Sequence, residues 1–194
     1  MVKPMETKQQ IRKRRLICRE EMDETAVRQI SAQIGNRLWE YFERGQTVRK
    51  VGVYGYYPHR KEVDLTILYQ NLLQANVPFA LPRASGETME FFRVRSMEED
   101  FEEGAFHIME PRRSCSRADF YDAVCLIPGS VFDRKGNRYG YGRGYYDRYL
   151  SLHPKLYRMG IAYEEQTEDE ILPERCDVSM HALATEKGIL FFGT

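Results

Sequence analysis

A continuous apolar run that leads directly into a glycine-rich stretch constrains this chain more than any other feature. Residues 123–127 read AVCLI, which is typical of a parallel strand buried on both faces of a sheet. The stretch that follows, residues 129–149, reads GSVFDRKGNRYGYGRGYYDRY, and from Tyr145 onward it has the pattern of a helix. The local order is therefore strand, glycine-rich loop and helix. This order predicts a loop at the carboxyl end of a sheet, where ligands bind in α/β proteins.

Strands and helices also alternate earlier in the chain. Residues 48–57 (VRKVGVYGYY) have the composition of a buried strand. Asp64 is well placed to cap a helix that ends near residue 75, and strands are expected at residues 77–81 and 88–94. This β–α–β order predicts an α/β fold with a parallel sheet and helices on its faces.

Two further helices are expected before the first strand. Residues 7–21 have a thin apolar pattern among many charges. A second helix, capped by Asp23 or Thr25 and running through Arg44, has an apolar face that we assign to the core. Short strands near the end of the chain are expected at residues 157–162, 181–184 and 188–192.

Length and charge narrow the class of protein. At 194 residues the chain can bury one good core, so we expect a single domain over residues 1–194. The 29 basic and 29 acidic residues balance, which argues against broad binding to nucleic acid or an anionic membrane. The sequence contains no apolar run near the ~20 residues that span a bilayer, and its first residues lack the apolar core of a signal peptide. The four cysteines form no close pair, so we expect reduced thiols in a cytoplasmic protein.

The glycine-rich stretch has the composition of a phosphate-binding loop. Glycines at alternate positions let a backbone approach a ligand closely, and the start of the following helix favours an anion. Cationic side chains in the same stretch suit phosphate. A flexible surface loop is the alternative for any glycine-rich segment. The glycines are Gly140, Gly142 and Gly144, and the cationic residues are Arg134, Lys135, Arg138 and Arg143.

Several other residues have two possible roles. Lys8 and Arg12 fall one turn apart on one helix face and could reach one polyanion, although the residues alone favour a solvated basic helix. Glu62 could bind a ligand or interact with the dipole of the helix that follows it, and its position alone slightly favours the helix.

Two carboxylates stand out as magnesium partners, Asp147 and Asp177, because Mg²⁺ takes oxygen ligands. Alternatively, Asp147 pairs with Arg143 or Arg148 on its own helix. The glycine spacing matches neither a P-loop nor the dinucleotide-binding G-x-G-x-x-G. The residues by themselves therefore indicate an α/β domain that binds a magnesium–nucleotide or a phosphate, without specifying a reaction.

The segment from Ile127 to Asp147, with its ordered glycines, closely resembles the signature of the 5-formyltetrahydrofolate cyclo-ligase family, also called 5,10-methenyltetrahydrofolate synthetases. Shorter elements resemble the family in the same order along the chain. They are residues 8–12 (KQQIR), 62–64 (EVD), 81–83 (LPR), 110–111 (EP), Asp177 and 185–188 (TEKG).

The resemblance implies a three-layer α/β/α fold with a mainly parallel sheet, related to CoA-transferases and sugar-phosphate isomerases. It also implies ATP- and Mg²⁺-dependent closure of 5-formyltetrahydrofolate to 5,10-methenyltetrahydrofolate, with release of ADP and phosphate. A monomer that binds neither nucleic acid nor membrane is expected, and the basic residues 59–61 favour a polyglutamylated folate. The alternative is a catalytically idle relative that binds a nucleotide or RNA in the same cleft.

Carried over residue by residue, the resemblance implies a division of labour. Arg138 and Arg143 would be catalytic, and Asp147 and Asp177 would hold Mg²⁺. The implied ATP-binding residues are Lys8, Arg12, Arg134, Gly136, Asn137, Arg138, Tyr139, Gly140, Tyr141, Gly142, Arg143 and Gly144, and the implied folate-binding residues are Tyr57, Glu62, Tyr145 and Tyr146.

Overall fold

A seven-stranded sheet forms the centre of the molecule in the computed structural model, which describes residues 6–45, 52–104 and 108–193. The strands lie in the order β12–β11–β9–β6–β1–β2–β3. Their bounds are β1 Val53–Tyr54, β2 Phe79–Ser85, β3 Thr88–Arg93, β6 Val124–Pro128, β9 Tyr157–Ile161, β11 Ala182–Thr185 and β12 Gly188–Phe191. The start of the strand expected at residues 48–57 falls outside the described residues.

Five neighbouring strands of this sheet, from β11 to β2, are parallel, and the two edge strands are antiparallel. The expectation of a mainly parallel sheet is therefore confirmed. From β1 the chain moves outward to β2 and then crosses back to β6, β9 and β11 on the other side. The direction of winding thus reverses between β1 and β6, and such a switch point is where α/β sheets bind ligands.

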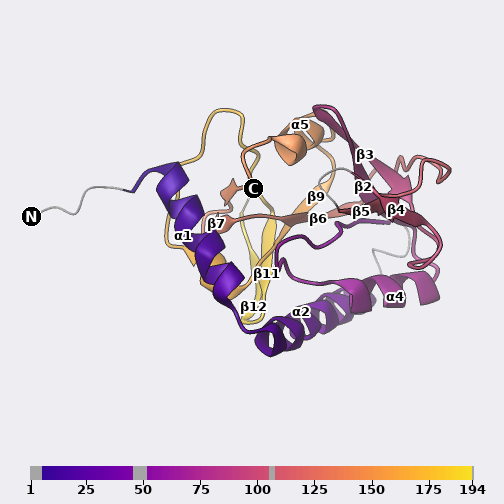
Figure 1. The fold of residues 1–194 in the computed structure, drawn as a ribbon, viewed down its shortest axis with the longest axis horizontal. Coiled ribbons are helices and arrows are strands. Elements are labelled where there is room, and N and C mark those ends of the chain that lie inside the picture. The colour runs from indigo at the N-terminus through magenta and orange to yellow at the C-terminus, as the bar shows by residue number, and fades with distance from the viewer. Residues whose placement is uncertain (1–5, 46–51, 105–107, 194) are drawn as a thin grey trace, which may run out of the picture.

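Helices cover both faces of the sheet, which gives three layers (Figure 1). Helices α2 (Glu24–Gly45) and α4 (Thr66–Gln74) pack on one face and α5 (Tyr145–Leu152) on the other. Side chains of β6 alternate between the two cores: Leu126 packs with the α2 and α4 side, and Ile127 with the α5 side. The unbroken apolar run in the sequence reflects this burial on two faces.

Local capping explains where the helices begin. Helix α1 (Lys8–Glu21) starts at Thr7, whose side chain forms a capping box with Gln10. Asp23 accepts hydrogen bonds from the backbone N–H groups of Thr25 and Ala26 in the first turn of α2. Asp64 accepts one from the N–H of Thr66 at 2.8 Å, but it lies one residue before the N-cap position of α4, which Leu65 occupies without a side-chain bond. These helices agree closely with the sequence-based expectation.

The first half of the glycine-rich stretch differs from the expected loop. It forms an antiparallel hairpin, which joins β10 in a second, three-stranded sheet. Asp133 closes the hairpin turn: its buried carboxylate accepts from the backbone N–H groups of Lys135 and Asn137, and also from distant Ile171. The additional elements are β4 Phe101–Glu103, β5 Met109–Pro111, β7 Val131–Asp133, β8 Arg138–Tyr139, β10 Thr167–Glu168 and the 3₁₀ helix η2 Glu164–Gln166.

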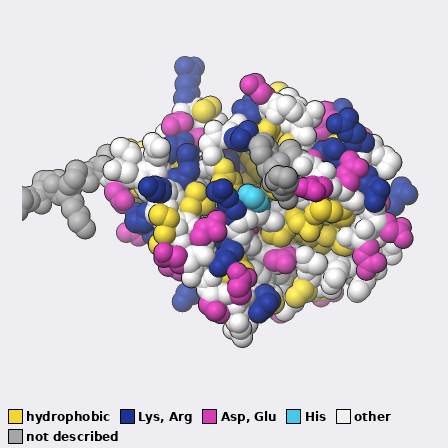
Figure 2. Space-filling model, in the orientation of Figure 1, with side chains coloured by type: hydrophobic (Ala, Val, Ile, Leu, Met, Phe, Trp, Pro, Cys, Tyr) yellow, Lys and Arg dark blue, Asp and Glu magenta, His cyan; other side chains and the backbone are white. Residues whose placement is uncertain are grey.

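The surface carries a mixture of charges. On the face seen in Figure 2, basic and acidic side chains are interspersed. Within the described part of the chain, no helix has the length and apolar character needed to span a bilayer.

Candidate active site

The candidate site lies at the switch point between β1 and β6. The turn after β1 carries Glu62, and β6 leads to Gly129 and the hairpin that carries Arg138. Glu62 is only 6% exposed and Arg138 only 5%. A carboxylate and a guanidinium are thus enclosed where the fold favours ligand binding, and residues of the glycine-rich loop connect them.

Helix α1 brings a row of cationic side chains to the same place. Lys8, Arg12, Arg15 and Arg19 follow helical spacing along one face, and three of them have partners in the body of the protein. Lys8 bonds to Asp177 at 3.0 Å, and Arg15 donates to Glu168 at 2.7 Å. Arg19 is only 1% exposed. This face of α1 is therefore turned inward, and the solvated alternative does not hold for it.

The loop after β8 packs tightly between two guanidinium groups. A Cβ at Gly140 would lie 2.7 Å from Nη1 of Arg138, and one at Gly142 would lie 3.2 Å from Nη1 of Arg12. Gly142 also has φ of +93°, a conformation that side chains disfavour. The glycines therefore let the backbone lie directly against two cations.

Three arginines around this loop have an unused hydrogen-bond donor. Among the described residues, the only buried side-chain nitrogens or oxygens without a partner are the Nε atoms of Arg12, Arg19, Arg138 and, in α2, Arg37. A buried donor without a partner costs about 1–3 kcal/mol. Guanidinium donors of this kind suit an anion such as phosphate.

Arg138 also holds the first carboxylate that the sequence singled out. Its Nη2 lies 3.0 Å from each carboxylate oxygen of Asp147, and its Nη1 donates to the carbonyl of Pro128 at 3.2 Å. Arg148, one of the expected partners of Asp147, instead donates to the carbonyl of Glu87. Asp147 is therefore tied to β8 by an ion pair.

A chain of three polar side chains joins α1 to Glu62. Arg19 donates to the hydroxyl of Tyr141 at 2.5 Å, and that hydroxyl donates to Oε1 of Glu62 at 2.7 Å. Burial raises the pKa of Glu62, whereas Arg19 and the Tyr141 hydrogen bond oppose this rise. Although Tyr141 is 38% exposed, its hydroxyl points inward to these two partners.

A tight turn presents Glu62 to the site. Arg60 and Lys61 have φ of +50° and +52°, which is uncommon for residues other than glycine. The turn is closed by Glu62, whose Oε2 accepts from the backbone N–H of His59 at 2.9 Å. Lys61 donates to the carbonyls of Glu20 and Met22 at the end of α1. The geometry of Glu62 thus depends on α1 as well as on its own turn.

Other predicted site residues lie at the margins of this arrangement. Arg134 pairs with Glu164 at 2.8 Å, and Asn137 supports the hairpin turn through Asp133. Tyr145 donates to the carbonyl of Gly86. These three side chains hold neighbouring elements in place.

The aromatic side chains are divided between the site and its surroundings. Tyr146 lies beside Arg138, whose guanidinium carbon is 5.7 Å from the ring centre. Tyr57 packs on Phe101 with ring centres 5.8 Å apart, and Tyr139 donates to the carbonyl of Leu172.

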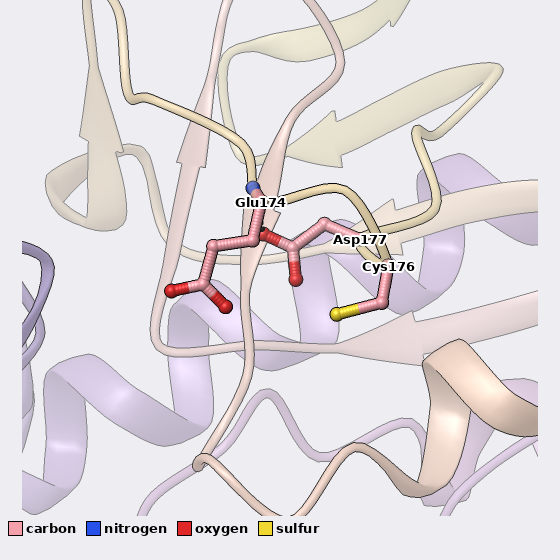
Figure 3. Close-up of side chains that lie close together, drawn as sticks. All are labelled: Glu174, Cys176 and Asp177. Atoms are coloured by element: carbon pink, nitrogen blue, oxygen red, sulfur yellow. Dashed lines mark hydrogen bonds between the residues drawn. The ribbon is translucent and has the colours of Figure 1, made fainter.

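Asp177 belongs to a separate acidic group in the loop between β10 and β11. The ligand atoms of Glu174, Cys176 and Asp177 lie within 4.8 Å of one another (Figure 3). The ammonium of Lys8 lies 3.1 Å from Glu174 and 3.0 Å from Asp177. The two carboxylates therefore already hold a cation, and Asp147 is not a member of this group.

Arg19 and Asp133 are central to the site but were not singled out from the sequence. Arg19 lies at i+7 from Arg12 and i+11 from Lys8, so the spacing on α1 contained the signal. Asp133 precedes a turn with a glycine at 136, which has φ of +90°. The hydrogen bond that Asp133 accepts from Ile171 joins residues 38 positions apart, so no local sequence pattern predicts it.

Comparisons with known proteins identify the family and support the fold. The family model described as the 5-formyltetrahydrofolate cyclo-ligase family matches residues 4–186. The NMR structure of Aquifex aeolicus 5,10-methenyltetrahydrofolate synthetase is similar with a TM-score of 0.83 and 31% identity, covering 96% of this chain and 93% of that one. A 5-formyltetrahydrofolate cyclo-ligase from Mycoplasma genitalium is 26% identical over 84% of this chain and 88% of its own length. A probable 5-formyltetrahydrofolate cyclo-ligase from Schizosaccharomyces pombe is 26% identical over 68% of this chain and 72% of its own length. The chain belongs to the 5-formyltetrahydrofolate cyclo-ligase family.

Proposed function

We propose that this protein uses ATP to close 5-formyltetrahydrofolate to 5,10-methenyltetrahydrofolate, releasing ADP and phosphate. The observation that carries the proposal is the set of three buried Nε donors, on Arg12, Arg19 and Arg138, around a glycine loop that also contacts Glu62. We infer that an anion binds beside this loop and that Glu62, which is bonded to Tyr141 of the same loop, binds a heterocycle. Membership of the cyclo-ligase family identifies the reaction to which this pair of subsites belongs.

The reaction needs help because a formamide oxygen is a poor leaving group. In the proposed sequence, the formyl oxygen attacks the γ-phosphorus of ATP, and the bond from that phosphorus to ADP breaks. The neighbouring nitrogen then attacks the formyl carbon and loses its proton, and the carbon–oxygen bond breaks to release phosphate. Positioning and charge neutralisation supply most of the catalysis in phosphoryl transfer.

The residues divide between the two ligands. We assign the triphosphate to Lys8, Arg12, Arg138 and the loop of residues 140–144, in which Arg143 adds a cation near the transferred phosphoryl group. Contact with the bound phosphates would give the unused Nε donors of Arg12 and Arg138 a partner.

The folate lies on the other side of that loop. We assign its ring system to Glu62, which can accept hydrogen bonds from pterin N–H groups, and to an aromatic wall that includes Tyr146 beside Arg138. We also assign Tyr57, which packs on Phe101, and Tyr145, which bonds to the carbonyl of Gly86, to the folate.

Magnesium fits this site only in part. Both oxygens of Asp147 are bonded to Arg138, and Asp177 is bonded to Lys8, so direct coordination by these carboxylates would require each to release a cation. We therefore propose that Mg²⁺ is held mainly by the ATP phosphates and water, with Asp147 and Asp177 bonded to its water ligands. When bound, the ion would offset phosphate charge.

The basic residues next to Glu62 affect whether the enzyme favours a folate with a polyglutamate tail. Lys61 is committed to the end of α1, which leaves the exposed Arg60 as the better partner for a polyglutamate tail. We also propose a monomeric cytoplasmic enzyme that binds neither nucleic acid nor membrane. Its balanced charge and the four free cysteines support this proposal.

One assay tests the activity directly. The purified protein is mixed with 5-formyltetrahydrofolate, ATP and Mg²⁺, and the absorbance of the methenyl product is followed together with ADP formation. We expect one ADP for each methenyl product and no product without ATP. An idle nucleotide-binding relative would bind ATP and leave the folate unchanged, and that result at micromolar protein would defeat the proposal.

A further inference from the structure

We propose that Arg19 is a positioning residue for Glu62: acting through the Tyr141 hydroxyl, it holds the Glu62 carboxylate in place and directs it at the folate. This inference rests on the proposed function, in which Glu62 binds the substrate. Arg19 was not among the residues that the sequence indicated as part of the site. Its role follows from its contacts alone.

The contacts place Arg19 at the junction of the two subsites. One terminal nitrogen donates to the carbonyl of Gly129, where β6 enters the glycine-rich stretch, at 3.3 Å. The other donates to Tyr141, and the guanidinium carbon lies 5.6 Å from the centre of that ring. Because the Tyr141 hydroxyl accepts from Arg19, its own proton is available for Glu62, which accepts it at 2.7 Å. The hydrogen bonds therefore run in one direction, from Arg19 through Tyr141 to Glu62, because the arginine side chain can only donate.

The groups around Glu62 leave few other sources of positive charge. Arg19 from α1 and Arg138 from β8 both act to lower its pKa, and the backbone N–H of His59 bonds to its second oxygen. Burial and nearby Arg60 and Arg19 lower the pKa of the His59 ring. Four tyrosines from other elements also interact electrostatically with Glu62. Burial raises the pKa of each tyrosine, so these side chains are neutral. They are Tyr56, Tyr69, Tyr146 and Tyr163.

A purely structural role explains Arg19 less well. An arginine that is 1% exposed normally has its donors satisfied, yet its Nε has no partner. Arg15, one turn earlier on the same face, instead makes three bonds, to Glu168 and to two backbone carbonyls. Arg15 therefore fastens α1 to the second sheet, whereas Arg19 bonds to the carbonyl of Gly129 and to Tyr141, which in turn bonds to Glu62.

The charge state of Glu62 decides what it can bind. An ionised carboxylate accepts hydrogen bonds at both oxygens, whereas a protonated one donates from one of them. A pterin that presents N–H groups needs the ionised form. Loss of Arg19 removes one of the influences that favour ionisation, so the low-pH fall in folate binding should move to higher pH.

The test compares pH profiles of kcat/KM for 5-formyltetrahydrofolate in three α1 variants. For Arg19→Met we expect kcat/KM at neutral pH to fall about ten- to hundredfold, the scale of a hydrogen bond to a charged group, mostly through KM. The acid limb of its pH profile, where kcat/KM falls as the pH is lowered, should move to higher pH. Arg19→Lys, which restores the charge without the planar fork, should move the limb back towards the wild-type position. Arg15→Met is the matched control: it should lower thermal stability and leave the limb in place.

Tyr141→Phe provides a second test that does not depend on the fold of the Arg19 variant. It removes the relay hydroxyl and retains the ring, so its acid limb should also move to higher pH. Tyr139→Phe, in strand β8 just before that loop and bonded to the carbonyl of Leu172, should not move the limb. Superimposable acid limbs for the wild type, Arg19→Met and Tyr141→Phe would overturn the inference. An inactive wild-type protein would instead overturn the proposed function, which makes the two failures distinguishable.

Discussion

At the scale of single residues, the ion pair between Arg138 and Asp147 combines stability with function. The two side chains are 3% and 17% exposed. Removing one member of a buried pair leaves the other charge without compensation, which usually costs more than the pair itself contributes. Arg138 therefore cannot be removed without consequences for both the anion site and the fold.

The first prediction concerns this pair. We expect Arg138→Met to lower the free energy of unfolding by about 3–5 kcal/mol, because Asp147 becomes a largely enclosed, unpaired carboxylate. The double variant with Asp147→Asn should recover much of that loss. Urea denaturation at constant m-value measures both changes.

The surface pair of Lys135 and Glu170 serves as its control. These side chains are 59% and 57% exposed, so Lys135→Met should change the free energy of unfolding by less than about 1 kcal/mol. A loss in Arg138→Met no larger than in this control would contradict the prediction.

The second prediction concerns the pH dependence of stability. Because burial raises the pKa of Glu62 above its ordinary value of 4.5, the folded state holds the proton at pH values where the unfolded state has lost it. Stability is therefore lost as the pH rises from the ordinary value through the raised one. Glu62→Gln cannot ionise and should escape this loss, so its Tm relative to the wild type should increase with pH across that window. A Tm difference that is independent of pH would contradict this expectation.

At the scale of elements, the loop between β8 and α5 owes its shape to the absence of side chains. Gly142 combines a positive φ with a close approach to Arg12. Gly86, in the turn between β2 and β3, also has a positive φ of +59°, but a Cβ there would meet nothing within 4 Å. A side chain at Gly86 would therefore cause backbone strain alone, whereas one at Gly142 would cause both strain and crowding against Arg12.

The third prediction uses this difference. Alanine at either position should cost about 1–2 kcal/mol through its left-handed conformation. Only Gly142→Ala should also push Arg12 away from the loop, and we expect ATP affinity to fall at least about tenfold, equivalent to 1.4 kcal/mol. Titration calorimetry with a non-hydrolysable ATP analogue measures this change. Equal affinities in the two variants would show that the loop does not bind the nucleotide.

Much of the architecture could be predicted because its causes are local. The apolar run predicted β6, and the helix expected from Tyr145 is α5, which ends at Leu152. The hairpin of β7 and β8 was missed because Asp133 stabilises it partly through Ile171, which is 38 residues away. Arg19 shares the helical spacing of Lys8 and Arg12, but charges on several sides of α1 made this signal easy to miss.

Only part of the site could be predicted from the sequence, because many of its contacts join distant residues. The glycines and Arg138 could be singled out by composition and resemblance. Their partners could not, since the bonds between Arg138 and Asp147 and between Tyr141 and Glu62 depend on how distant segments pack. The assignment of these residues to ATP, folate and Mg²⁺ remains a prediction.

At the scale of the whole molecule, the anion site links ligand binding to stability. Three arginines with unused buried donors weaken the ligand-free protein. A ligand that satisfies them binds only the folded state and therefore stabilises it by mass action.

The fourth prediction follows from this linkage. ATP at about 100 times its Kd should add about 2.7 kcal/mol to the free energy of unfolding. For a domain of this size that corresponds to a rise in Tm of about 5–11 °C, at about 2–4 °C for each kcal/mol. Inorganic tripolyphosphate should also raise the Tm, whereas adenosine should have little effect. A larger shift with adenosine than with tripolyphosphate would place the main contacts on the base.

The inward face of α1 also has a consequence for biosynthesis. This helix is synthesised before its partners: Lys8 bonds to Asp177, 169 residues later, and Arg15 bonds to Glu168, 153 residues later. Nascent chains that lack these late segments cannot dock the helix, so its charged face must stay in water while the sheet assembles. Polar side chains tolerate this exposure to water, whereas an equally long apolar face would expose a surface prone to aggregation. The polar side chains that would hold a triphosphate in the finished enzyme thus also suit this helix to water until the segments on which it docks have been made.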